Sequence, residues 1–292
     1  MKIAFYTLGC KVNQYETQVL SQLFAARGWE VLDFSFDGGW DACVVNSCTV
    51  TAEGDRKTRQ LLRRLRREHP EAALALTGCF PQAFPEEAAA LPADVITGSR
   101  DRLRLADALE RFLATRERVV EIRPHQRGEA FEEMETGDFG RRTRAFVKIE
   151  DGCENWCAYC IIPAARGPVR SKAPEALRAE LEALAKSGHR EVVLSGINLS
   201  AYGREFGMRL IDAVELALSL IHIFTSPRSV REARSTASAR ECPPATAARF
   251  WPAAAPEAAR SFPCKEMPTL VGVLFRSASF SREDKTDLSE DQ

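Results

Sequence analysis

Three closely spaced cysteines constrain this chain of 292 residues more than any other feature. They are Cys153, Cys157 and Cys160, in the run Cys-Glu-Asn-Trp-Cys-Ala-Tyr-Cys, so the spacing is Cys-x3-Cys-x2-Cys. This triplet supplies one thiolate fewer than a four-iron cluster takes, which leaves one iron without a protein ligand. An open position of this kind can bind a substrate or a cofactor, as in other catalytic metal sites. We therefore expect a catalytic iron–sulfur cluster on the triplet.

A zinc site and a disulfide network are the two alternatives for the triplet. Zinc sites usually combine two Cys-x2-Cys halves, and the sequence places no fourth ligand near the triplet. Disulfides belong to oxidising compartments, and the start of the chain, Met-Lys-Ile-Ala-Phe-Tyr, has too short an apolar stretch for a secretion signal. We also find no run approaching the roughly 18 apolar residues that cross a membrane. We therefore expect a cytoplasmic protein with no membrane partner.

Short apolar runs alternate with amphipathic stretches over residues 1–115. The periodicities predict strands at 2–6, 30–34, 42–45, 73–77 and 94–97, and helices at 13–27, 51–69, 85–91 and 101–115. This alternation is typical of an α/β domain with a doubly wound parallel sheet, whose ligands lie beyond the carboxyl ends of the strands.

Three further cysteines lie at such strand ends. Cys10, Cys48 and Cys79 follow the first, third and fourth predicted strands, so we expect these N-terminal cysteines to converge on one edge of the sheet. The alternative is that each is a small buried apolar residue, because free cysteine is often buried. Cys43 lies inside a predicted strand, and we assign it to the core.

The rest of the chain divides into three segments. Residues 116–141 are charged and poor in apolar side chains, and we interpret them as a linker. Residues 142–218 contain strands at 143–150 and 191–195 and helices at 174–187 and from 210, which is the start of a partial (βα) barrel. Residues 219–292 are rich in Arg, Ala, Ser and Pro and keep no period, so we expect an irregular tail from a frameshift or a chimeric join, the alternative being a disordered extension.

Four ordered motifs contain these cysteines. They are Gly9-Cys10-Lys11-Val12-Asn13-Gln14-Tyr15-Glu16, Asn46-Ser47-Cys48-Thr49-Val50, Thr77-Gly78-Cys79, and the triplet followed by Ile161-Ile162-Pro163 and Arg166-Gly167-Pro168. Together they resemble the motifs of the radical S-adenosylmethionine tRNA methylthiotransferases. The resemblance covers residues 1 to about 218, and the residues after Cys10 are most similar to the subgroup that acts on threonylcarbamoyladenosine.

The resemblance implies two 4Fe-4S clusters and S-adenosylmethionine as cofactors. The triplet would bind S-adenosylmethionine, whose one-electron cleavage gives a radical that takes hydrogen from C2 of the modified adenosine beside the anticodon. The N-terminal cysteines would hold the cluster that presents sulfur, and a second S-adenosylmethionine supplies the methyl group. The expected partners are a tRNA anticodon stem-loop and a reducing electron donor.

Three residues outside the cysteines are candidates for cofactor binding. Gly196 and Asn198 follow a predicted strand, where the family contacts the methionyl end of the cofactor; the alternative for Asn198 is a turn residue. Arg166 lies just past the triplet, within reach of a cofactor carboxylate or an RNA phosphate. A basic helix at 51–69 suits phosphate contacts or, alternatively, forms a solvated face, because the chain has 40 Lys and Arg against 41 Asp and Glu.

The sequence departs from the family pattern after Leu218. The family continues with further βα units and a small β-barrel that binds RNA, and neither is recognisable here. The activity of this chain as written is therefore open. The alternatives are a methylthiotransferase acting on isopentenyladenosine in tRNA or on a ribosomal protein, or a non-catalytic iron–sulfur protein.

Overall fold

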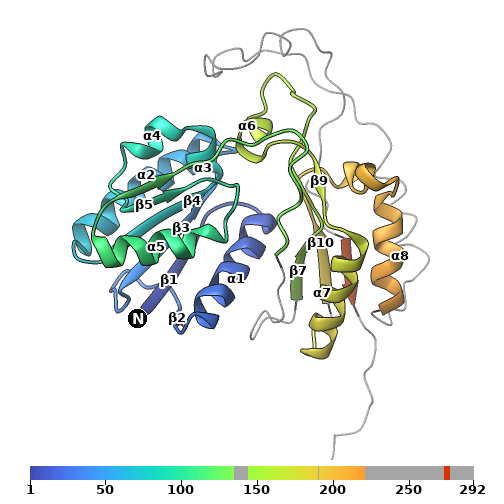
Figure 1. The fold of residues 1–292 in the computed structure, drawn as a ribbon, viewed down its shortest axis with the longest axis horizontal. Helices are drawn as coiled ribbons and strands as arrows, with labels where there is room; N and C mark the ends of the chain where they lie inside the picture. The colour runs from blue at the N-terminus through green and yellow to red at the C-terminus, as the bar shows by residue number, and fades with distance from the viewer. Residues whose placement is uncertain (135–143, 190, 221–272, 277–292) are drawn as a thin grey trace, which may run out of the picture.

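The computed structural model describes residues 1–134, 144–189, 191–220 and 273–276, which form two α/β parts side by side (Figure 1). The first part is built around a six-stranded sheet and the second around a three-stranded sheet. Helix α1 (Lys11–Ala26) lies between them in Figure 1.

The six-stranded sheet is parallel throughout. Its strands are β1 (Lys2–Thr7), β2 (Glu30–Leu32), β3 (Ala42–Ser47), β4 (Ala73–Gly78), β5 (Val95–Thr97) and β6 (Val119–Glu121). They lie in the order β2-β1-β3-β4-β5-β6. In the register, Cys43 of β3 is opposite Ala4 on one side and Leu74 on the other. Strands β3 and β4 are buried at every residue, as expected for the centre of a parallel sheet covered on both faces.

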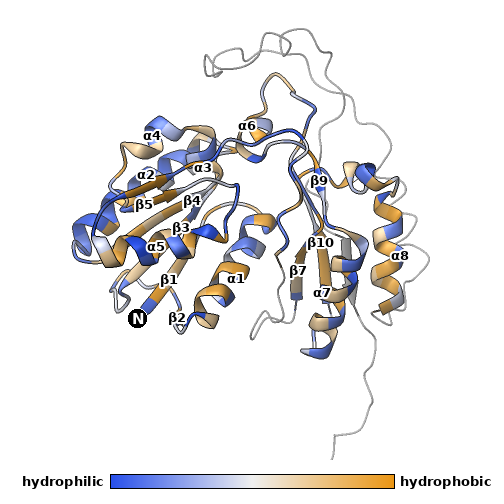
Figure 2. Ribbon diagram, in the orientation of Figure 1, coloured by the Kyte–Doolittle hydropathy of each residue, from blue (hydrophilic) through white to orange (hydrophobic). Residues whose placement is uncertain are grey.

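Helices cover both faces of this sheet. Helices α1 and α5 (Arg104–Thr115) bury Leu20, Phe24 and Leu109 against one face. Helices α2 (Ala52–Glu68), α3 (Cys79–Ala83) and α4 (Pro85–Ala89) cover the other face, where Leu62 and Leu65 pack on the sheet. Apolar stripes on these helices turn toward the strands (Figure 2). The predicted α/β fold is therefore confirmed, and its strands and longer helices lie within a few residues of their predicted bounds.

The second part contains a parallel βαβ unit. Strands β7 (Arg144–Lys148) and β10 (Glu191–Ser195) are parallel neighbours, and α7 (Pro174–Lys186) connects them in the chain. Strand β8 (Glu150–Asp151) pairs with β9 (Arg170–Ser171), and α6 (Ile162–Arg166) lies between these two in sequence. Two 3-10 turns, η1 (Leu199–Ala201) and η2 (Arg204–Phe206), precede α8 (Leu210–Leu220).

Helix α1 joins the two parts. Tyr15 and Val19 belong to the apolar core of the second part, although they lie on a helix of the first. The Tyr15 hydroxyl donates to the carbonyl of Met134 at 2.5 Å and contacts Glu180 Oε1 at 2.9 Å. The two parts therefore share one continuous packing surface along α1.

The linker and tail differ in places from the sequence prediction. The segment predicted as a linker, 116–141, contributes β6 to the edge of the sheet and buries Phe131 and Met134. Residues 135–143 lie outside the described residues. Most of the tail predicted as irregular, 219–292, also lies outside them, but β11 (Val273–Arg276) is a strand antiparallel to β10. No helix in the described part of the chain is long and apolar enough to cross a membrane.

Candidate functional site

The N-terminal cysteines meet at one edge of the six-stranded sheet. Cys10 follows β1 and precedes the first turn of α1, Cys48 follows β3, and Cys79 follows β4 as the first residue of α3. Strands β1, β3 and β4 are neighbours in the sheet and run in the same direction. Their carboxyl ends therefore bring together three cysteines that are far apart in sequence, as the sequence predicts.

Glycines before two of these cysteines allow the close approach. Gly9 has φ +115°, and a Cβ added there would lie 2.8 Å from Cys48 Cβ. Gly78 has φ +101°, and its Cβ would lie 2.5 Å from the carbonyl oxygen of Ser47. Only glycine combines a positive φ with so little space. The backbone before Cys10 and before Cys79 is thus pressed against the segment that carries Cys48.

Of the N-terminal cysteines, Cys79 is buried and Cys10 and Cys48 are half-buried, and one cation acts on all three. Burial raises the pKa of all three thiols, and the Arg166 guanidinium opposes this effect. The Cys10 thiol donates to Asn13 Oδ1 at 3.2 Å. Arg166 Nε lies 3.1 Å from Cys79 Sγ. Three thiols and one buried cation make a site that suits thiolate ligands with a compensating charge.

The triplet lies in the loop between β8 and α6. Cys153 is buried, and Cys157 and Cys160 are half-buried. Burial raises the pKa of Cys153 and Cys160, while the backbone amides of Asn155 and Ile162 hydrogen-bond to these two sulfurs and lower it. Backbone donors therefore already face two of the three thiols of the triplet.

The N-terminal cysteines and the triplet share an apolar wall. Val12, Cys153 and Ile197 form a buried contact group, and Cys10 and Ile162 pack against it. Helix α3, which begins at Cys79, also contacts α6, which follows the triplet. One cysteine of each set, Cys10 and Cys153, therefore lies in the same apolar contact group, beside Val12 and Ile197.

The donor sets fit iron–sulfur clusters. Each set offers three thiols, and thiolates are the usual protein ligands of such clusters. Among the residues that the structure describes, no three His, Cys, Asp or Glu side chains are grouped to hold a single metal ion. Cys43, by contrast, is buried inside β3, where burial raises its pKa to about 12, and it belongs to the core as predicted.

The other predicted site residues each have a defined contact. Asn198 is buried, and its Nδ2 lies 3.8 Å from Cys153 Sγ. Gly196 lies against Glu150, because a Cβ on Gly196 would be 2.8 Å from Glu150 Oε2. Arg166 is fully buried and faces the N-terminal cysteines. Their proposed role in cofactor binding stays a prediction.

A buried network of charges that the sequence analysis missed lies behind Arg166. Glu16 of α1 is fully buried and contacts Arg166 at 2.5 Å, Arg102 at 3.1 Å and Lys148 at 3.2 Å. Burial by itself would raise the pKa of Glu16, but the three cations outweigh it and lower the pKa. The available signal was the position of Glu16 on the same face of its helix as Val12 and Val19, since a carboxylate on an apolar face needs a partner.

Glu150 is a second buried carboxylate, with a different environment. Its Oε2 accepts a hydrogen bond from the backbone amide of Asn198 at 2.5 Å, and its Oε1 is buried with no hydrogen-bond partner in the structure. Burial raises the pKa of Glu150 to about 8. The side chain beneath Gly196 is therefore held mainly in its neutral form at pH 7.

The basic helix α2 carries paired charges. Six of its basic side chains have a carboxylate partner, with contacts such as Arg56 to Glu53 at 2.7 Å and Arg66 to Asp94 at 2.5 Å. The alternative that α2 presents a solvated, charged face explains these ion pairs. Contact of α2 with RNA phosphates stays a prediction.

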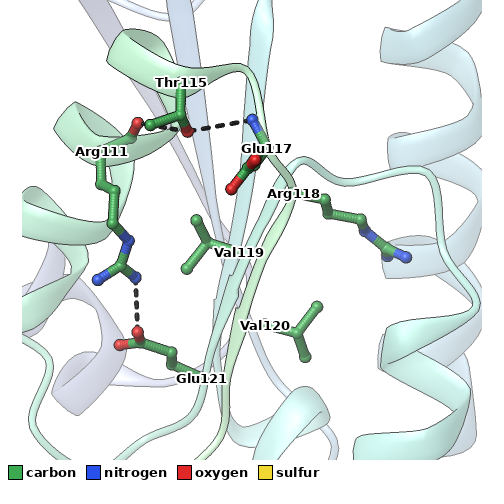
Figure 3. A pocket seen from close by; sticks show the side chains of 7 residues that line it. All are labelled: Arg111, Thr115, Glu117, Arg118, Val119, Val120 and Glu121. Atoms are coloured by element: carbon green, nitrogen blue, oxygen red, sulfur yellow. Dashed lines mark hydrogen bonds and ion pairs between the residues drawn. The ribbon is translucent and has the colours of Figure 1, made fainter.

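The hollow drawn in Figure 3 lies away from the cysteines. It is lined by residues from Arg111 to Glu121, at the end of α5 and along β6, with a volume of about 240 Å³. Two of its charged groups pair within the hollow, since Arg111 Nη2 contacts Glu121 Oε1 at 2.5 Å. We assign no function to it.

Comparison with known proteins shows which families the chain is similar to. Residues 2–98 match the model of the uncharacterized protein family UPF0004. Over 204 residues the chain is 40% identical to threonylcarbamoyladenosine tRNA methylthiotransferase MtaB of Bacillus subtilis, covering 70% of this chain and 45% of that protein. The protein of the same name from Aquifex aeolicus is 39% identical over 76% of this chain and 57% of its own length. The predicted resemblance is confirmed.

The resemblance to the tRNA methylthiotransferases extends beyond one subgroup. A tRNA-2-methylthio-N(6)-dimethylallyladenosine synthase from Pelotomaculum thermopropionicum is 32% identical over 76% of this chain and 50% of its own length. Among solved structures, the radical S-adenosylmethionine methyltransferase TsrM of Kitasatospora setae superposes with a TM-score of 0.46 and 15% identity, covering 80% of this chain and 52% of that chain. The chain spans about half the length of the curated relatives that it matches.

Proposed function

We propose that this chain functions as a tRNA methylthiotransferase that adds a methylthio group to C2 of N6-threonylcarbamoyladenosine beside the anticodon. The observation that carries the proposal is the packing of Cys10 and Cys153, one from each cysteine set, against Val12 and Ile197. The identity to MtaB proteins, higher than that to the dimethylallyladenosine synthase, favours threonylcarbamoyladenosine as the substrate.

The residues divide the work between the two cysteine sets. The triplet would hold one 4Fe-4S cluster with S-adenosylmethionine, and the N-terminal cysteines would hold the other. When bound, these groups supply one-electron chemistry that breaks an unactivated C–H bond, together with sulfur and a methyl group for transfer. The protein then has to bind and orient the cofactors and the substrate and to exclude water, which is the usual role of the protein in cofactor enzymes.

The chain has side chains suited to each of these tasks. Val12, Ile162 and Ile197 place apolar surface between the two cysteine sets, which keeps water out of the region where they meet. Asn198 lies close enough to Cys153 to orient a group bound beside the triplet. Partners of the proposed activity are a tRNA anticodon stem-loop and a reducing electron donor, and its place is the cytoplasm.

Iron binding tests the ligand sets directly. After anaerobic reconstitution with iron and sulfide, we expect the chain to hold two four-iron clusters. Replacing Cys10, Cys48 and Cys79 by alanine should remove half of the iron, and replacing the triplet should remove the other half. The matched control is Cys43→Ala, a buried cysteine outside both sets, which should retain all of the iron. Equal iron in all four proteins would refute the assignment.

Product analysis tests the reaction. With a reductant, S-adenosylmethionine and tRNA that carries threonylcarbamoyladenosine, we expect 5′-deoxyadenosine and a methylthio group on that nucleoside by mass spectrometry. A methylthio group on isopentenyladenosine or on a ribosomal protein would replace the proposed substrate. Intact S-adenosylmethionine in the reduced, fully loaded protein would favour the non-catalytic iron–sulfur alternative.

A further inference from the structure

Arg166 is the cation that approaches the N-terminal cysteines most closely. It is the last residue of α6, six positions after Cys160 in the second part of the molecule, and its side chain is 1% exposed. A guanidinium stays charged under all ordinary conditions, so its burial is costly unless every donor finds an acceptor. Its partners therefore indicate what holds it there.

One edge of the guanidinium faces the thiols of the other part. Nε lies 3.1 Å from Cys79 Sγ, and Nη2 donates to Asn13 Oδ1 at 3.0 Å. The same Asn13 oxygen accepts from the Cys10 thiol at 3.2 Å. Arg166, a residue of the second part, is thus hydrogen-bonded directly to Cys79 and, through Asn13, indirectly to Cys10.

The other edge is fixed by carboxylates. Nη1 contacts Glu16 Oε1 at 2.5 Å and both oxygens of Asp151 at 3.4 Å. Glu16 belongs to the first part, and Asp151 lies two residues before Cys153 of the triplet. Burial would lower the pKa of Arg166, but Cys79, Glu16 and Asp151 outweigh it and raise the pKa. The planar fork is therefore held in one orientation by groups from both parts.

We propose that Arg166 is a positioning residue that sets the reduction potential of the cluster on Cys10, Cys48 and Cys79. The inference rests on the proposed function for the presence of that cluster. A hydrogen bond and a positive charge at a ligating sulfur stabilise the more negative, reduced cluster and so raise its potential. The second part of the molecule would thus tune the cluster of the first.

The test measures the potential of that cluster alone. The protein is the full chain with Cys153, Cys157 and Cys160 changed to alanine, reconstituted with iron and sulfide, so that only the N-terminal cluster can form. Redox titration followed by electron paramagnetic resonance then compares Arg166, Arg166→Gln and Arg166→Lys. The matched control is Arg102→Gln, because Arg102 is equally buried and also pairs with Glu16, at 3.1 Å, but has no hydrogen bond to any thiol of the described residues.

We expect Arg166→Gln to lower the reduction potential of the N-terminal cluster by about 59 mV or more. For a one-electron reduction this is a tenfold change in the equilibrium constant. Arg166→Lys should fall between the two, since it keeps the charge and loses the fork, and it provides the comparison if the glutamine variant does not fold. Arg102→Gln should shift the potential less than either. In addition, the magnetic coupling between the cluster and the exchangeable N–H proton of residue 166 should be weaker in Arg166→Lys.

Two outcomes would overturn the inference, and they are distinguishable. If the cluster forms and Arg166→Gln or Arg166→Lys shifts its potential no more than Arg102→Gln does, Arg166 acts only through Glu16 and the tuning role is wrong. If the triplet-free chain binds no cluster although it folds, the N-terminal cysteines are not a ligand set, and the proposed function fails together with this inference.

Discussion

The two cysteine sets differ in how the fold builds them. The N-terminal cysteines come from the ends of three neighbouring strands, β1, β3 and β4, and the sheet fixes their separation. The triplet comes from a single loop between β8 and α6. A site built by a sheet depends on the stability of a whole domain, whereas a site built by a loop depends mainly on local backbone conformation.

Two buried glutamates extend this contrast. Glu16, behind the N-terminal cysteines, has three cationic partners, and its pKa is lowered although burial opposes this. Glu150, behind the triplet, accepts from the backbone of Asn198, and burial raises its pKa to about 8. One site is therefore supported by an ionised carboxylate and the other by a largely neutral one, so pH should affect them in opposite directions.

The largest effect should come from breaking the charge network. Glu16→Gln leaves Arg102, Arg166 and Lys148 buried without their shared anion, and removal of one member of a buried ion pair costs about 3–5 kcal/mol. We expect urea unfolding, followed by tryptophan fluorescence, to show a loss of this size. The control is Glu68→Gln, which removes an exposed partner of Arg64 and should change the unfolding midpoint little. Equal losses in the two variants would contradict a structural role for the network.

The same network should fail in acid. Glu16 has a lowered folded pKa, so its contribution to stability is present above its unfolded pKa near 4.5 and is lost as pH falls through the folded value. We expect the wild-type free energy of unfolding to decline below about pH 4.5. The Glu16→Gln chain should show a flatter profile there, and parallel profiles for the two chains would contradict the assignment.

Glu150 should produce the opposite slope. Its folded pKa is raised to about 8, so its contribution is present below about 4.5 and is lost as pH rises through about 8. Glu150→Gln mimics the neutral acid, and at about 1.4 kcal/mol per pKa unit it should stabilise the chain by roughly 3 kcal/mol at pH 7. At pH 4 the two proteins should be equally stable. A gain that is the same at both pH values would indicate a packing effect instead.

A smaller effect is expected from substituting a glycine that lies beside only one of the two cysteine sets. Gly78→Ala places a Cβ at 2.5 Å from Ser47 O with φ +101°, and strain of this kind costs about 1–3 kcal/mol. We expect the reconstituted variant to lose iron from the N-terminal cysteines and to keep that of the triplet. Gly188→Ala is the control, because Gly188 has φ +85° and none of the described residues lies within 4 Å of its Cβ position. Loss of iron in both variants would point to backbone strain alone.

The sequence was sufficient to predict the sheet and the cysteine positions because both follow local rules. Strand 191–195 was predicted with the bounds that β10 has, since its apolar run is bounded by polar residues. Convergence of the N-terminal cysteines followed from the parallel direction of the strands. Two of the elements that escaped prediction are β6, which lies in the charged segment 116–141, and α6, which follows the cysteine loop without an apolar period of its own.

The partners of buried charges could not be predicted from the sequence. Arg166 and Glu16 are 150 residues apart in sequence, and no local pattern links them. Proximity to the triplet alone favoured a cofactor or phosphate role for Arg166, while the structure gives its side chain an acceptor from each part of the molecule. Such pairs depend on how two domains pack, which is a long-range property that periodicity does not encode.

The finest distinction between the two sites should come from Asn198. Asn198→Ala removes the amide 3.8 Å from Cys153 Sγ, a weak contact worth about 1 kcal/mol or less, so the potential of the triplet cluster should fall by less than a tenfold change in its reduction equilibrium. Ser200→Ala is the control, since it removes only the hydroxyl that donates to Asn198 Oδ1 at 2.7 Å. The N-terminal cluster should keep its potential in both variants. A shift in both clusters would mean that the apolar wall of Val12, Cys153 and Ile197 transmits the change, and the two cysteine sets would then be one coupled site.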